Sequence, residues 1–201
     1  LGSAGIVVRG RKETLFYTGD VCFHDQTILR GARFEDVKAD VLLMETTRGQ
    51  RQLPPGFSRE KEIQRLSESI LRVLHRRGSV LIPAFALGRT QEILTLLAIM
   101  MREGKLKPQP VYIGGLGRVF TEIYDLESHR THRQYPNLQM HDALNLTVLE
   151  QGQVNKMKLT GGRLFVVTAG MMSEHTASHN LALRMIGDKD QAIFFVGYAD
   201  P

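Results

Sequence analysis

Short apolar runs alternate with amphipathic stretches along most of the chain, and this alternation predicts its secondary structure. The apolar runs are rich in Val, Ile, Leu and Phe, as buried strands are. Strands that alternate with helices form crossover units, so we expect an α/β fold with a mainly parallel sheet flanked by helices. The strands of this sheet are predicted at residues 80–82, 111–113, 146–149, 164–167 and 193–196.

The longest amphipathic stretch predicts a helix that begins after Ser58. Ile63, Leu66 and Ile70 recur on one face at helical spacing. Ser58 suits the N-cap position, and Gly78 is expected to supply the left-handed residue that ends the helix. Further helices are predicted over residues 88–101, 118–126 and 176–186.

The first 44 residues are expected to form strands that are joined by a hairpin rather than by helices. Residues 5–8 and 15–17 flank a basic turn at residues 9–12, which indicates a hairpin. Residues 41–44 form a continuous apolar run, the pattern of a strand covered on both faces. Both strand regions end in polar residues.

Candidate chemistry gathers where predicted strands end. Asp20, Glu45 and the pair Gly170 and Met171 each follow a predicted strand. The carboxyl ends of parallel strands face one crevice, where two carboxylates can bind a metal or share a proton. A carboxylate after a strand is also a common turn cap, and spacing alone leaves both roles open for Asp20.

Composition narrows the class of protein. Hydrophobic residues make up 42% and charged residues 23% of the 201 residues, which is globular composition. The net charge of +5 suits a partner rich in phosphate. Cys22 is the only cysteine, so an intrachain disulfide is excluded and a reducing, cytoplasmic setting is expected. No apolar run approaches the ~20 residues that span a bilayer, so no membrane partner is expected.

Four segments carry a resemblance to a known family. They are Tyr17-Thr18-Gly19-Asp20, Met44-Glu45-Thr46-Thr47, residues 82–92 and Ala169-Gly170-Met171-Met172. Their order and separations resemble the β-CASP group of the metallo-β-lactamase superfamily. That group includes the endonuclease of mRNA 3′-end processing and bacterial and archaeal ribonucleases. The Pro-Ala-Phe-Ala-Leu-Gly-Arg sequence at residues 83–89 is the most specific piece.

The resemblance implies a zinc-dependent ribonuclease that hydrolyses phosphodiester bonds. Asp20 matches an aspartate that bridges two zinc ions, and Glu45 matches a carboxylate that holds a metal-ligating histidine. Asp20 and Glu45 are therefore the candidate catalytic residues, with Asp20 as the metal ligand. Arg89, at a predicted helix start, suits a phosphate, with packing as its alternative role. The candidate substrate-binding residues are Thr46, Arg89, Gly170 and Met171.

The chain also departs from the family pattern. The His-x-His-x-Asp-His metal motif is absent from the arrangement of the seven histidines. A single carboxylate cannot hold a catalytic zinc pair, so we expect this chain alone to be inactive and to bind zinc weakly or not at all. Both ends look cut. Residues 1–49 are expected to be part of a lactamase domain with a partial sheet, 50–198 a β-CASP domain, and 199–201 a return to the lactamase domain.

The sequence is also compatible with other functions. The chain can instead be a non-catalytic nucleic-acid-binding or clamp module of an RNA-processing complex. A weaker alternative is an enzyme acting on a nucleotide, with a phosphate turn at residues 114–117. Single-stranded RNA is the expected partner, and DNA, homo-oligomer formation and endo- versus exonuclease action stay open. His175 and His179 are expected on one helix, where a metal pair is less probable than an ordinary surface or core role.

Overall fold

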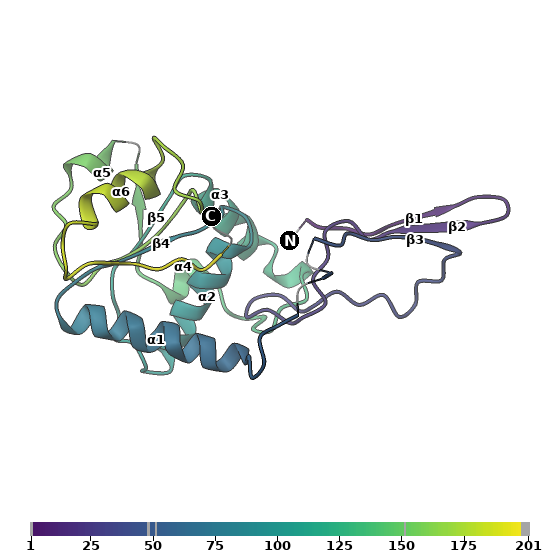
Figure 1. The fold of residues 1–201 in the computed structure, drawn as a ribbon, viewed down its shortest axis with the longest axis horizontal. Helices are drawn as coiled ribbons and strands as arrows, with labels where there is room; N and C mark the ends of the chain where they lie inside the picture. Colours follow the sequence, from purple (N-terminus) through teal and green to yellow (C-terminus); the bar gives the residue numbers. More distant parts are fainter. Residues whose placement is uncertain (1, 48, 51, 151, 198–201) are drawn as a thin grey trace.

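Two sheets organise the chain (Figure 1). The computed structural model describes residues 2–47, 49–50, 52–150 and 152–197. The larger sheet, called the main sheet below, has five strands that all run parallel, in the order β6-β5-β7-β4-β8. Its strands are β4 (Val80–Pro83), β5 (Val111–Gly114), β6 (Leu146–Leu149), β7 (Leu164–Val167) and β8 (Ala192–Ile193). The predicted α/β fold with a parallel sheet is confirmed.

Helices cover both faces of the main sheet, and together they form the body of the molecule (Figure 1). On one side lie α1 (Arg59–His75), α2 (Arg89–Arg102), α3 (Leu116–Leu126) and α4 (Met140–Ala143), with the short 3₁₀ helix η1 (Ser128–Arg130) after α3. On the other side lie α5 (Gln153–Lys156) and α6 (Ala177–Met185). No helix in the described part of the chain is both long and apolar enough to cross a bilayer.

The central strands are apolar throughout because both of their faces are buried. All residues of β4 and β7 are buried. Side chains alternate between the two faces of a strand. Ile82 accordingly packs in the core under α1 and α2, whereas its neighbour Leu81 packs in the core under α5 and α6.

The end of α1 corrects one prediction about a glycine. Ser58 is the N-cap as expected, with its hydroxyl accepting a hydrogen bond from the Lys61 N–H at 3.4 Å. The left-handed residue at the C-terminus, however, is Arg77, with φ of 63°. The next residue, Gly78, has to be a glycine because a Cβ atom there would lie 1.7 Å from the carbonyl oxygen of Asp190. Close approach of another backbone segment, rather than a positive φ, therefore requires this glycine.

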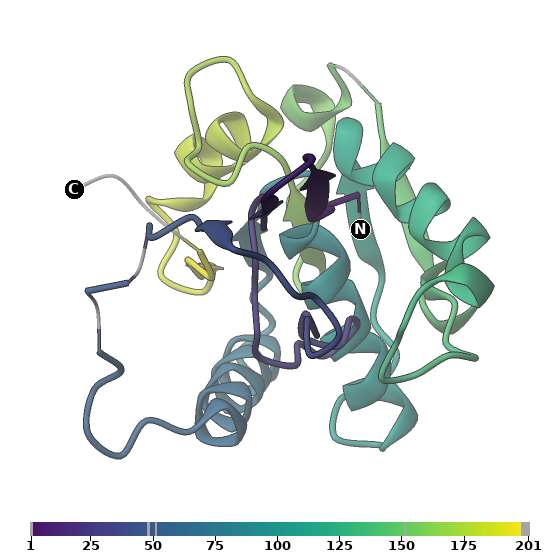
Figure 2. The ribbon, with the colours of Figure 1, turned by 90° about the vertical axis from the view of Figure 1, so that its right-hand side faces the viewer.

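The smaller sheet projects from the body as an arm (Figure 1). It consists of β1 (Ile6–Arg9), β2 (Thr14–Tyr17) and β3 (Val41–Leu43), in that order. The β1–β2 pair is antiparallel, so the predicted hairpin is confirmed, and β3 adds to β2 in parallel. Figure 2 looks along the arm and shows its strands in front of the middle of the body.

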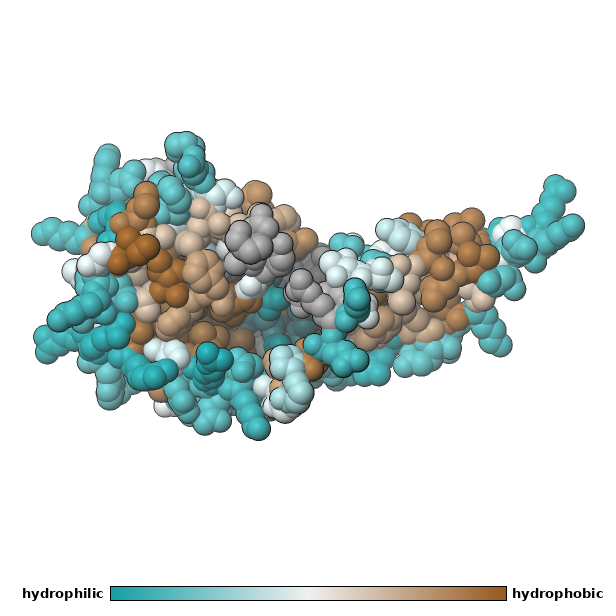
Figure 3. All heavy atoms as spheres, viewed as in Figure 1, coloured by the Kyte–Doolittle hydropathy of each residue, from teal (hydrophilic) through white to brown (hydrophobic). Residues whose placement is uncertain are grey.

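The prediction that β3 is covered on both faces is wrong for the described residues. Leu42 and Leu43 are 58% and 51% exposed. β3 is the outer strand of the arm, and nothing in the described part of the chain packs over it. Hydrophobic side chains consequently gather on the surface of the arm (Figure 3).

The segment between β2 and β3 leaves the arm and docks on the body. Ile28 is buried in the core below α2. The N–H of Arg30 donates to the carbonyl of His132 at 3.0 Å, and the N–H of Gln134 donates to the carbonyl of Ile28 at 3.2 Å. This segment joins the arm to the body by backbone contacts.

The last strand differs from its prediction. A buried strand was expected at residues 193–196, but β8 spans Ala192–Ile193 and is only half-buried. It pairs with β4 alone and forms an edge of the main sheet. The predicted helices are confirmed, with starts that differ by one or two residues: α2 at Arg89, α3 at Leu116 and α6 at Ala177.

Candidate functional site

The parallel pairing of β2 with β3 brings the carboxyl ends of these strands together. Tyr17 is level with Leu43, and the N–H of Thr18 donates to the carbonyl of Leu43 at 3.0 Å. Asp20 and Glu45 follow shortly after these paired residues. Both strands end on the side of the arm that faces the body (Figure 1).

Glu45 is held by hydrogen bonds from its surroundings. Its carboxylate accepts the backbone N–H of Thr47 at 2.9 Å. This hydrogen bond, with smaller contributions from the Thr47 hydroxyl and the backbone N–H of Val21, lowers the pKa of Glu45 below its ordinary value. Because Val21 is the residue after Asp20, the two strand-end segments meet at the Glu45 carboxylate.

Asp20 presents an exposed carboxylate. Gly19 turns the chain just before it with φ of 60°, and a Cβ atom at Gly19 would lie 2.8 Å from the carbonyl of Ala4. The backbone carbonyl of Asp20 accepts the hydroxyl of Ser3, but its carboxylate accepts no hydrogen bond from any described residue. A turn-capping role for this side chain therefore has no hydrogen bond to support it within that part of the chain.

The described residues do not form a zinc site. They contain no group of three or more His, Cys, Asp or Glu side chains placed to hold a metal ion. Asp20 supplies one carboxylate, which is too few ligands for a zinc pair. The expectation that His175 and His179 share one helix is wrong, because His175 lies before the start of α6 with φ of 64° and only His179 lies on the helix.

Arg89 and Gly170 lie at the carboxyl edge of the main sheet. Gly170 is buried, and a Cβ atom there would lie 2.9 Å from the backbone nitrogen of Phe85. The carbonyl of Phe85 accepts the hydroxyl of Thr90 at 2.8 Å, next to Arg89 at the start of α2. Phe85 therefore connects the segment after β7 with the start of α2. Met171 is 48% exposed.

Arg89 opens onto a groove of about 690 Å³, called the α1–α2 groove below. Arg59 and Arg65 of α1 line it as well, each paired with a carboxylate of the same groove, Glu92 and Glu62 respectively. Residues 193–197 complete one side of it. Thr46 lies elsewhere, exposed in a turn after β3, where its carbonyl accepts the N–H of Gly49 at 2.9 Å. The structure thus places Thr46 with Asp20 and Glu45, and Arg89 with the body.

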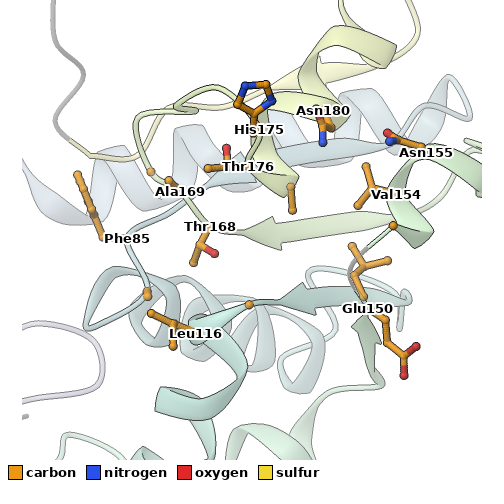
Figure 4. A pocket seen from close by; sticks show the side chains of 16 residues that line it. Phe85, Leu116, Glu150, Val154, Asn155, Thr168, Ala169, His175, Thr176 and Asn180 are labelled. Atoms are coloured by element: carbon orange, nitrogen blue, oxygen red, sulfur yellow. The ribbon is translucent and has the colours of Figure 1, made fainter.

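A second hollow, called the edge cavity below, lies beside Gly170 (Figure 4). Its volume is about 560 Å³. It is formed by residues after β4, β5, β6 and β7 and by the starts of α5 and α6. The lining side chains that sequence reasoning did not single out include Asn155, Thr168 and Asn180. The turn at residues 114–117, Gly170 and His175 were the sequence signals near it.

Comparison with known proteins decides the family. Residues 90–201 match a protein-family model described as the Beta-Casp domain. The match covers more than half of the chain. The chain belongs to the Beta-Casp family. The β-CASP resemblance seen in its four sequence segments is confirmed.

Similar proteins come from archaea and a eukaryote. The Beta-Casp chain is 28% identical over 200 residues to "RNase aCSPSF2" of Saccharolobus solfataricus, covering 98% of this chain and 38% of that protein. It is 28% identical over 205 residues to "Cleavage and polyadenylation specificity factor subunit 3" of Dictyostelium discoideum, covering 99% of this chain and 26% of that protein. It is 30% identical over 208 residues to "Probable RNase MJ4" of Methanocaldococcus jannaschii, covering 98% of this chain and 45% of that protein. The chain thus spans less than half the length of these relatives.

Proposed function

We propose that the protein containing this Beta-Casp chain hydrolyses phosphodiester bonds in RNA. The observation that carries the proposal is the meeting of the Asp20 and Glu45 segments at the paired ends of β2 and β3. The names of the relatives as ribonucleases support the same activity. The exposed Asp20 carboxylate, without a hydrogen-bond partner among the described residues, is available to a ligand.

In this proposal Asp20 is one ligand of a zinc pair, and the other ligands come from parts of the protein outside the described residues. Glu45 is a positioning residue. A carboxylate with a lowered pKa stays ionised near neutral pH and can accept a hydrogen bond from a metal-ligating imidazole. The single carboxylate of Asp20 explains why this chain alone is expected to be inactive.

The α1–α2 groove supports single-stranded RNA as the substrate through Arg89, at the start of α2, whose guanidinium can contact a phosphate. Arg59 and Arg65 line the same groove, but they form ion pairs with Glu92 and Glu62. We assign Thr46 to the arm side of the substrate path. Gly170 and Met171 are assigned to the body side, where the segment after β7 packs against Phe85.

We also propose the domain boundaries expected from the sequence. Residues 1–49 belong to the lactamase part and residues 50–198 to the Beta-Casp domain, in line with the change from the arm to the main sheet. The expected return at residues 199–201 lies outside the described residues.

We further propose a reducing, cytoplasmic setting for the protein. Cys22 is exposed and forms no disulfide, which fits such a setting.

The test is a cleavage assay on the intact protein, with end-labelled single-stranded RNA and DNA of one sequence and added zinc. Asp20→Ala should lower the RNA cleavage rate at least about 100-fold, and Glu45→Gln about 10-fold. Asp36→Ala, at an exposed carboxylate away from both strand ends, is the matched control and should keep the wild-type rate.

Wild-type cleavage by Asp20→Ala would refute the site. Tight RNA binding with no cleavage by the intact wild-type protein would favour the non-catalytic clamp instead. Cleavage of the DNA strand alone would reject RNA as the substrate.

A further inference from the structure

The edge cavity is not used by the proposed roles of Asp20, Glu45 or Arg89. Its volume of about 560 Å³ suits a small organic ligand better than a single ion. β5 and β7 are neighbours in the main sheet, yet the chain leaves them toward opposite faces, into α3 and α6 respectively. Ligands of parallel α/β sheets bind where neighbouring strands diverge in this way.

The walls of the edge cavity offer apolar surface for a flat ligand. Leu149 and Val154 are buried, while Phe85 and Leu116 are 40% and 62% exposed. Figure 4 shows Phe85 and Leu116 at one end of the opening and Val154 at the other. Aromatic and aliphatic surfaces of this kind stack against the faces of nucleobases.

Three polar side chains of the edge cavity have free hydrogen-bonding capacity. The side chains of Asn155, Thr168 and Asn180 make no hydrogen bond to any other residue that the structure describes. Asn155 of α5 and Asn180 of α6 lie at the same end of the cavity (Figure 4). An amide offers both donors and an acceptor, which matches the edge of a base.

The charge around the edge cavity argues against a phosphate group as the part that is bound. No Lys or Arg occurs among the described residues that line it, and His175 is the one side chain among them that can carry a positive charge. Its one carboxylate, on Glu150, points away from the opening (Figure 4). Arg89 faces the α1–α2 groove instead, so the two hollows suit different parts of a nucleotide chain.

We infer that the edge cavity binds one nucleobase of an RNA strand, unstacked from its neighbours. Phe85 and Leu116 cover the face of the base, and Asn155, Asn180 and Thr168 contact its polar edge. The inference rests on the proposed function, because it names the part of the RNA that this surface recognises. Binding in the edge cavity would give the protein a preference for certain bases in an RNA that it otherwise contacts through phosphates.

The direct test is an NMR titration of the chain with adenosine, guanosine, cytidine and uridine, with ribose 5-phosphate as the control ligand. At least one nucleoside should shift the side-chain amide resonances of Asn155 and Asn180, with a dissociation constant of about 1 mM. Ribose 5-phosphate should leave them unchanged. Asn180→Leu and Asn155→Leu should each weaken nucleoside binding at least about tenfold, because the leucine cannot form the hydrogen bonds.

Asn137→Leu makes the same change at an exposed position outside the cavity and should bind nucleosides like the wild type. Asn155 is exposed, so its variant tests the cavity even if Asn180→Leu fails to fold. The inference is overturned if no nucleoside shifts these resonances at ~10 mM, or if ribose 5-phosphate binds equally well. Nucleoside binding without RNA cleavage would reject only the nuclease proposal, and cleavage without nucleoside binding would reject only the base site.

Discussion

Glu92 on α2 holds the backbone of Ile28, 64 residues earlier in the sequence, through an N–H···O hydrogen bond of 3.0 Å. The same carboxylate accepts the N–H of Thr27 at 2.7 Å and the guanidinium of Arg59 on α1. Glu92 is 2% exposed. One buried carboxylate therefore fastens the segment between β2 and β3 to two helices of the body.

Glu92→Ala should lower the free energy of unfolding by about 3 kcal/mol, because it leaves two N–H groups and the Arg59 charge without their acceptor. Urea denaturation followed by circular dichroism measures the change. Glu122→Ala removes an exposed i,i+4 ion pair with Arg118 and should cost no more than about 0.5 kcal/mol. Equal costs for the two variants would contradict the fastening role.

A glycine pair tests how closely backbone segments approach in the body. A Cβ atom at Gly161 would lie 1.5 Å from the carbonyl oxygen of Arg77, whereas one at Gly187 meets nothing within 4 Å. Gly161→Ala should therefore destabilise the chain by about 3 kcal/mol, and Gly187→Ala by less than about 0.5 kcal/mol. Thermal unfolding of both variants measures this, and a wild-type melting temperature for Gly161→Ala would show that the approach is looser.

The lowered pKa of Glu45 predicts a pH dependence of definite sign. Its folded-state pKa lies below the ordinary value of 4.5, chiefly because the backbone N–H of Thr47 donates to the carboxylate. The carboxylate therefore contributes stability above the ordinary pKa, and this contribution is lost as the pH falls through the folded-state pKa. Titration of the Glu45 carboxyl carbon by NMR should give a midpoint below 4.5.

Thr47→Pro removes the donating N–H, so it should move this midpoint back toward 4.5. Thr47→Val keeps the backbone donor and removes only the hydroxyl, so it should give the smaller change. A midpoint that neither variant moves would assign the shift to another group.

The exposed apolar side chains of the arm predict self-association. β3 is an edge strand, and Leu42 on it is 58% exposed. Unpaired edges and contiguous apolar surface promote association between chains. Leu42→Lys should lower the association that sedimentation velocity detects as the concentration rises. Leu183→Lys, at a 63% exposed leucine on α6, is the control and should leave association unchanged. Equal effects would place the contact outside the arm.

Local patterns in the sequence were enough to predict most elements of the body. The helical spacing of Ile63, Leu66 and Ile70 located α1, and Ser58 marked its start. The pattern did not show that Arg77 takes the left-handed conformation, because Gly78 is required by Asp190, which is distant in sequence. The apolar run of β3 shows only that these side chains favour burial, so its exposure was not predictable from that run.

The candidate site was predictable to the extent that it depends on where strands end. Asp20 and Glu45 were found because each follows a strand, and the pairing of β2 with β3 places them together. The edge cavity was missed because β7 inserts between β5 and β4, an order that no local pattern reveals. Asn155 and Asn180 can be assigned to one cavity only once that order is known.

The docked segment around Ile28 also limits how the arm can move. The polypeptide crosses from arm to body after β2 and returns to the arm before β3, and Glu92 holds the segment between these two crossings. A single tether would let the arm swivel freely. A second crossing and the fastening at Glu92 remove much of that rotational freedom. The position of the strand ends that carry Asp20 and Glu45 is thereby set by chain connectivity as well as by packing.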